Sequence, residues 1–152
     1  MISVDPGTRW CGVAEWKDAE LIWAGLVSTD DLPSRWVIVD DPIVVIEKPQ
    51  VYQDMKVDPD DLVNLAIVVG RVIGPEKRNV TIYKPSQWKG QLDKKITTAR
   101  TLASLSKEEI SRIVLPRAVK TLGHNVYDAI GIGLAYLRKT GQRVGKLKAV
   151  QR

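Results

Sequence analysis

The stretch ISVDPGT at residues 2–8 decides how this chain folds. A short apolar run ends at Asp5, and the Pro6-Gly7 pair that follows predicts a tight turn. Burying an acid at the end of an apolar strand costs free energy unless a cation or hydrogen bonds compensate for it. Two interpretations are therefore open: Asp5 belongs to a metal or phosphate site, or it only caps the turn.

Apolar runs predict the strands that follow this turn. Residues 10–17 and 20–28 are strand-like and closely spaced, so with residues 2–5 they predict an antiparallel meander of three strands. Residues 43–47 form a continuous apolar run, which is typical of a strand buried on both faces. Residues 79–84 predict one more strand.

The clearest helix signal begins at residues 58–61, where a capping acid and a proline precede further acids. This helix is expected to run to about residue 73, where Gly74 and Pro75 end it. Its buried face is expected to comprise Leu62, Leu65, Ala66, Val69 and Ile73. Further helices are expected around 35–39, 96–105, 107–115 and 125–138, and Ser106 with Glu109 predicts a capping box for the third of these.

Strands followed by helices predict one α/β domain over residues 1–140, with a sheet covered by helices. A chain of 152 residues that is 44% hydrophobic suits one domain with a buried core. Residues 141–152 are expected to be a basic tail. From Arg138 onward the chain holds six Lys or Arg residues and no acid.

The formal net charge of +5 favours an anionic partner such as nucleic acid, although ordinary surface lysines give the same balance. Cys11 is the only cysteine, which excludes an intramolecular disulfide. The chain also has only one histidine, and one cysteine with one histidine cannot supply the four ligands of a Cys/His zinc site. No signal peptide or membrane-spanning run is evident, so we expect a cytoplasmic protein, from a bacterial or phage-infected cell, without membrane contact.

Two further acids stand in positions like that of Asp5. Glu47 closes the apolar run 43–47, where it is either a site residue or a solvated strand end. Asp128 is the only acid in an otherwise apolar helix, where it is either a site residue or an acid favoured by the helix dipole. His124 and Asn125, one turn earlier, can share its face, and His124 is also explained as a capping or surface residue.

Acids from two strands and a packing helix can converge on one point. Mg²⁺ and Mn²⁺ prefer carboxylate oxygens, and one or two such ions support phosphodiester hydrolysis. The three acids together therefore predict a divalent-metal site.

The ordered set of motifs resembles the RuvC-type Holliday-junction resolvases of the RNase H-like superfamily. The matching segments are ISVDPGT with Gly12-Val13-Ala14, Val45 to Pro49, Leu65 to Val72, Lys84 to Gly90, and His124 to Leu134. The resemblance implies an RNase H-like α/β fold, whose mixed sheet has three antiparallel strands followed by parallel ones.

The same resemblance assigns Asp5, Glu47 and Asp128 as metal ligands. The family usually has a fourth ligand, often Asp, one turn before the last acid. Here that position is Asn125, with His124 beside it, so either of them could replace the ligand. The spacing between the first two acids is also shorter than is usual in the family.

The resemblance further implies a homodimer that cuts opposing strands of a four-way junction, leaving a 5′-phosphate and a 3′-hydroxyl. The helix over 59–73 resembles the element used for pairing, although core packing alone would also explain its apolar face. Tyr52 and Gln53 are candidates for contact with the junction centre.

Basic residues predict where DNA binds, since Lys and Arg position phosphates. The resemblance places basic residues after the fifth strand near the scissile phosphate, with Lys89 the first candidate and Lys95 the second. Trp88 either stacks on a base or anchors in the core. The predicted DNA-binding residues are Lys84, Lys89, Lys94, Lys95, Arg100, Arg138 and Lys139.

Three other functions also agree with parts of the sequence. An actin-like ATPase or sugar kinase also begins with an acid-glycine-threonine turn, but it needs two domains and a second phosphate loop. Another RNase H-like nuclease, acting on flaps, forks or RNA-containing duplexes, would use the same acids. A branched-DNA-binding module without catalysis also stays open, because Asn125 replaces an expected acid.

Overall fold

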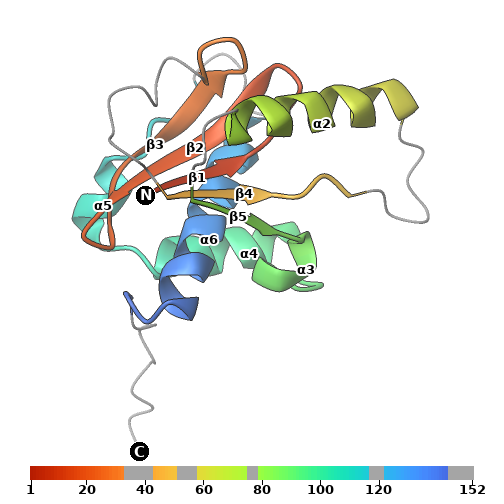
Figure 1. Ribbon diagram of the computed structural model, residues 1–152. Helices are drawn as coiled ribbons and strands as arrows, with labels where there is room; N and C mark the ends of the chain where they lie inside the picture. The colour runs from red at the N-terminus through yellow and green to blue at the C-terminus, as the bar shows by residue number, and fades with distance from the viewer. Residues whose placement is uncertain (33–42, 51–57, 75–78, 117–121, 144–152) are drawn as a thin grey trace, which may run out of the picture.

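A computed structural model gives the fold over residues 1–32, 43–50, 58–74, 79–116 and 122–143. The sheet has five strands in the order β3-β2-β1-β4-β5 (Figure 1). Their bounds are β1 Ile2–Asp5, β2 Trp10–Lys17, β3 Glu20–Ser28, β4 Val44–Glu47 and β5 Val80–Tyr83. The first three strands are antiparallel, while β4 and β5 continue parallel to β1, which confirms the predicted mixed sheet.

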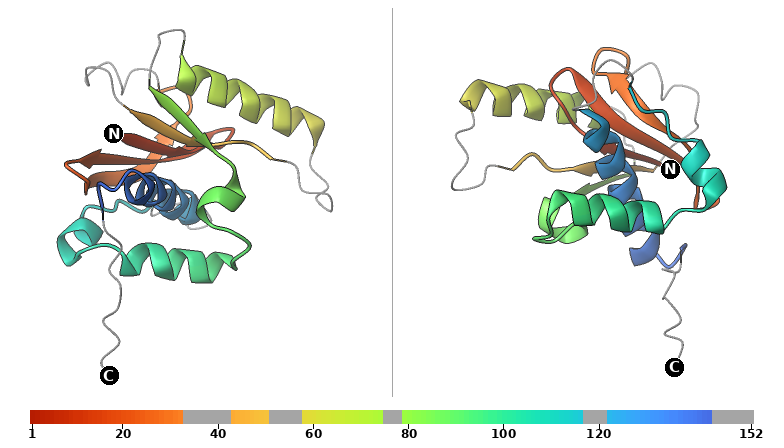
Figure 2. Two further views of the ribbon diagram at one scale, coloured as in Figure 1. Left: turned by 60° about the horizontal axis from the view of Figure 1, so that its bottom comes forward. Right: turned by 180° about the vertical axis from the view of Figure 1, so that it is seen from behind.

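Helices cover both faces of this sheet. Their bounds are α2 Pro59–Ile73, α3 Pro85–Trp88, α4 Lys94–Ala103, α5 Lys107–Ser111 and α6 Gly123–Lys139. Among the described helices, α2 covers one face, whereas α6 lies on the other with α4 packed outside it (Figure 2). The helix expected around 35–39, and Tyr52 and Gln53, lie outside the described residues. No helix in the described ranges is long and apolar enough to cross a membrane.

The pleat of β1 and β4 divides the core into two layers. Ile2, Val4, Val44 and Ile46 pack with the α2 face, in one apolar cluster with valines of that helix. The residues between them point the other way, because successive side chains of a strand alternate between faces. The side of the sheet under α6 therefore receives the alternate residues, including both strand-end acids.

Helix α6 lies very close to the sheet because glycines face it. A Cβ atom on Gly12 of β2 would come 1.9 Å from the Asn125 carbonyl oxygen, so only glycine fits there. On the helix side, a Cβ on Gly133 would come 2.6 Å from the Ser3 hydroxyl. That hydroxyl donates to the Ala129 carbonyl oxygen at 2.7 Å and accepts from the Trp16 indole at 2.9 Å. This close contact brings the polar side chains of α6 down onto the strand ends.

The helices differ from the sequence prediction in several places, among them α6, which begins at Gly123 rather than at 125. Helix α4 begins two residues early because the Asp93 carboxylate accepts the Lys95 backbone N–H at 2.7 Å. Helix α5 was expected to reach residue 115 but ends at Ser111, since the Val114 N–H pairs with the Ala24 carbonyl of β3 at 2.7 Å. The short helix α3 was not expected at all.

The prediction of the buried face of α2 was also partly wrong. Val69 is buried as predicted, but Ala66 is exposed, and Val68 and Val72 are buried instead. The helix contacts the sheet mainly through its C-terminal half, which turns these valines inward. Its outer side therefore carries exposed apolar residues, including Val63 and Ile67.

Glu109 ties the C-terminal end of α6 to the body of the domain. The predicted capping box with Ser106 forms, and the Glu109 carboxylate also accepts the Leu21 N–H at 2.9 Å and two Arg143 N–H groups at 2.6 and 2.7 Å. Burial alone would raise the pKa of Glu109, but the hydrogen bonds from Arg143 and the backbone outweigh it and lower the pKa to about 2. Arg143, assigned to the expected tail, thus bonds within the domain.

This pairing predicts a pH-dependent stability. Glu109→Gln should lower the free energy of unfolding by about 3 kcal/mol at neutral pH, because Arg143 loses its buried partner. Since the folded pKa lies below the usual 4.5, the wild type should lose this advantage as pH falls from about 4.5 towards 2. Urea unfolding across that range measures the effect, with the exposed Glu108→Gln as a control that stays near wild type. Equal losses of stability in Glu109→Gln and Glu108→Gln would contradict the stabilising role of the Glu109–Arg143 pair.

The contact at Gly12 predicts a second stability difference. Gly12→Ala should cost about 3 kcal/mol or more, because α6 must move away from β2. Gly70→Ala is the matched control: it lies in α2 with open space around its Cβ position, and it should stabilise the protein by up to about 1 kcal/mol. A Gly12→Ala protein as stable as the wild type would show that α6 does not need this approach.

Candidate active site

Two acids lie at the same end of neighbouring parallel strands. Val4 pairs with Ile46, and the next residues along each strand are Asp5 and Glu47. Ser3 faces α6 through its bond to Ala129, so Asp5, two residues later, points to the same side. Val45 packs against Ile132 of α6, and Glu47 follows it by the same alternation.

Asp128 meets these acids from the helix. It is 8% exposed and Asp5 is 9% exposed, so both carboxyl groups are largely removed from water. Burial, together with the charges of Asp128 and Glu47, raises the pKa of Asp5 well above its usual value. Burial also raises the pKa of Glu47 and of Asp128. The structure thus brings the three predicted acids together at a point that holds excess negative charge.

Lys89 supplies a cation to this cluster. Its ammonium lies 3.4 Å from Glu47 Oε2 and 3.8 Å from Asp128 Oδ2. Burial lowers the pKa of Lys89, but the charges of Glu47, Asp128 and Asp5 outweigh it, so the net shift is upward. Lys89, the residue immediately after α3, therefore stays protonated among the acids.

Trp88 contacts the site in a way that the sequence did not reveal. Its indole N–H donates to Glu47 Oε2 at 2.5 Å, and its ring lies 4.7 Å below the Lys89 ammonium. Of the two predicted roles, base stacking and core anchoring, the structure supports the second, since Trp88 packs against the buried cluster of Val45, Tyr83 and Ile132. The bond from its indole to a site carboxylate was not predicted. No local sequence signal reports this contact, because 41 residues separate the two partners.

The remaining candidates lie at different distances from the acids. The charges of Lys94 and His124 both lower the pKa of Asp128, which places them near that carboxylate. The backbone of Asn125 packs against Gly12, and its side-chain nitrogen lies near Gly7 in the turn after β1. His124 and Asn125 therefore border the cluster, and their roles as ligands stay predictions.

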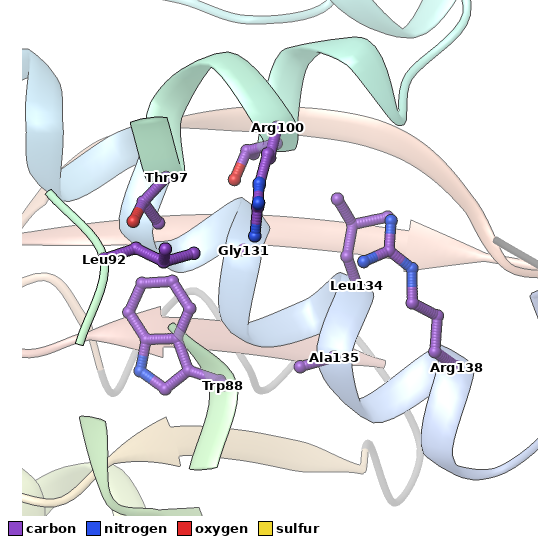
Figure 3. Close-up of a pocket in the computed structure, with 9 residues that line it drawn as sticks. Trp88, Leu92, Thr97, Arg100, Gly131, Leu134, Ala135 and Arg138 are labelled. Carbon is purple, nitrogen blue, oxygen red and sulfur yellow. The ribbon is translucent and has the colours of Figure 1, made fainter. Parts of the chain in front are cut away.

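The predicted DNA-binding residues lie at the two ends of α3, on α4 and at the C-terminal end of α6. These helices lie on the side of the sheet opposite α2 (Figure 1). Lys84, Lys94, Lys95, Arg100, Arg138 and Lys139 are exposed. Arg100 and Arg138 line a small pocket of about 130 Å³ together with Trp88 and Gly131 (Figure 3). Lys139 instead lies 5.4 Å over the Tyr83 ring.

The donor set fits a divalent cation by its chemistry. Within the described ranges, no three acidic, histidine or cysteine side chains are close enough to hold an ion as they stand. The Lys89 ammonium nevertheless occupies a position that two carboxylates reach at once. Because the acids have lost solvation and Lys89 bridges only two of them, a harder cation with oxygen preference can replace the charge that Lys89 supplies to the cluster.

Comparison with known proteins rests on structure alone, since no family model and no curated protein matches this sequence. RuvC from Thermus thermophilus is similar at a TM-score of 0.58 and 18% identity, over 93% of this chain and 98% of that one. The same protein in complex with a Holliday junction substrate is similar at a TM-score of 0.59 and 19% identity, over 92% of this chain and 96% of that one. The Fowlpox virus resolvase in complex with Holliday junction DNA is similar at a TM-score of 0.54 and 14% identity, over 91% of this chain and 98% of that one.

These likenesses extend over nearly the whole of each chain, and the sheet has the mixed order expected from the sequence motifs. The chain therefore has the same fold as RuvC and the Fowlpox virus resolvase.

Proposed function

We propose that this protein is a metal-dependent endonuclease that cleaves branched DNA, with the four-way junction as its substrate. The observation that carries the proposal is the convergence of Asp5, Glu47 and Asp128 around the Lys89 ammonium. Its fold is also that of two resolvases solved with Holliday junction DNA.

In this proposal, the three acids hold Mg²⁺ or Mn²⁺, with one or two ions in the site. Such an ion, when bound, activates water and stabilises the charge that develops on the phosphate and the leaving oxygen. Asp5 and Glu47 are fixed by the strand ends, and Asp128 is held over them by α6. This rigid support keeps the carboxylates in place.

Lys89 has two tasks in this mechanism. Without metal, its ammonium offsets the charges of Glu47 and Asp128. With metal and DNA bound, it is free to move to the scissile phosphate and offset the charge there. The exposed lysines and arginines beside α3 and on α4 and α6 contact more distant phosphates and position the strand.

The first test is Asp5→Asn. This variant should lose junction cleavage by more than the 10- to 100-fold that removing an outer partner of a ligand typically costs. DNA binding should persist, because no basic residue is lost. Since burial among acids raises the pKa of Asp5, neutral Asn should not lower the melting temperature in EDTA. Gel assays of cleavage and binding, with Mg²⁺, Mn²⁺ and EDTA, give the result.

The substrate is tested in the same assays. Four-way junction, fork, flap, duplex and RNA–DNA hybrid are compared at equal concentrations, and we expect the junction to be cut fastest. Preference for a flap, fork or hybrid would assign a different RNase H-like nuclease. Binding of the junction without cleavage in either metal would indicate an inactive binding module, and cleavage that persists in excess EDTA would contradict the metal mechanism.

We also propose a homodimer that pairs through α2. The outer side of this helix exposes Val63 at 56% and Ile67 at 50%, a row of apolar residues unusual for a solvated face. Two active sites on one dimer would allow cuts on opposing strands.

Ile67→Glu should convert this dimer to a monomer, because two charges would be buried at a symmetric interface. Light scattering after size-exclusion chromatography measures the mass. Ile110→Glu is the control, since Ile110 is comparably exposed at 42% but lies on α5. A wild-type monomer at assay concentrations, or a dimer that survives Ile67→Glu, would contradict pairing through α2.

A further inference from the structure

The indole of Trp88 lies between a site carboxylate and helix α6. Its N–H donates to Glu47 Oε2, and its six-membered ring lies against Gly131. Figure 3 shows the indole nitrogen turned away from the pocket residues Arg100 and Arg138, while the six-membered ring points towards Leu92 and Thr97. One side chain thus connects the end of β4 to the packed helix.

The orientation of this ring is set from two sides. A Cβ on Gly131 would come 2.5 Å from Trp88 Cζ3, so the helix leaves only enough room for the flat ring. The Lys89 ammonium lies over the ring at 4.7 Å. The ring also borders the pocket of about 130 Å³, so close packing does not hold it on every side. The bond to Glu47 is therefore a directional constraint in a partly open setting.

Both contacts on Glu47 fall on the same oxygen. Trp88 donates to Oε2, and the Lys89 ammonium lies nearest the same atom. Among the contacts of the described residues, Oε1 is thus the oxygen that remains for a cation. A carboxylate fixed at one oxygen loses less conformational freedom when its other oxygen binds a metal.

We propose that Trp88 is a positioning residue of the metal site, which holds the Glu47 carboxylate in the orientation that a divalent cation needs. This inference rests on the proposed function, and it assigns to Trp88 no contact with DNA. Partners of this kind, outside the ligand shell, typically change metal affinity by about 10- to 100-fold when removed.

The chain provides a matched control for this test. Trp16 is buried under the same helix and donates its indole N–H to Ser3 Oγ at 2.9 Å, in the core beside Gly133. Trp88→Phe and Trp16→Phe therefore each remove one indole hydrogen bond while keeping an aromatic ring. Only the first of these bonds reaches a carboxylate of the site.

The experiment is calorimetric titration of the full chain with Mn²⁺, without DNA. Trp88→Phe should weaken Mn²⁺ binding about 10-fold, whereas Trp16→Phe should bind like the wild type even if it unfolds at a lower temperature. Cleavage by Trp88→Phe should recover towards the wild-type rate as Mn²⁺ is raised, because all three carboxylates remain. If Trp88→Phe does not fold, Gly131→Ala is used instead, and displacement of the ring should also weaken binding.

Unchanged Mn²⁺ affinity in Trp88→Phe, or equal weakening in Trp16→Phe, would overturn the role of Trp88. In either case, loss of binding in Asp5→Asn would leave the proposed metal site standing. No Mn²⁺ binding by the wild type would overturn both proposals together.

Discussion

Three carboxyl groups held near one another at one end of the sheet are the constraint on which the rest of this structure depends. Like charges in a site of low polarity repel strongly, and each carboxylate also loses solvation. The raised pKa values of Asp5, Glu47 and Asp128 express that cost. A protein keeps such an arrangement where function uses it, and the surrounding fold must then supply the stability.

The surrounding fold supplies this stability through the close approach of α6 to the sheet. Gly12 lets the helix backbone reach β2, and Ser3 and Trp16 bond beneath it. The Glu109–Arg143 pair ties down the end of the same helix. Gly12 pairs with Asp5 in the sheet, and the Ser3 hydroxyl bonds to Ala129, which follows Asp128. These contacts therefore hold Asp5 and Asp128 in place without supplying a carboxylate themselves.

Much of this could be predicted from sequence, for a physical reason. All five strands were predicted within one residue, because strand alternation and apolar runs record burial directly. The convergence of Asp5 and Glu47 followed from their places at strand ends. Contacts that depend on tertiary packing could not be predicted: the end of α5 at Ser111, the inward valines of α2, and the bond from Trp88 to Glu47. In each case a partner distant in sequence decides the outcome.

The most direct test of the central claim is diffraction from crystals of the wild-type protein grown with Mn²⁺, recorded near the manganese absorption edge. The account predicts an anomalous peak about 2 Å from carboxylate oxygens of at least two among Asp5, Glu47 and Asp128, with the Lys89 ammonium displaced. Crystals that contain Mn²⁺ but show no peak at these acids, and retain Lys89 between Glu47 and Asp128, would contradict it.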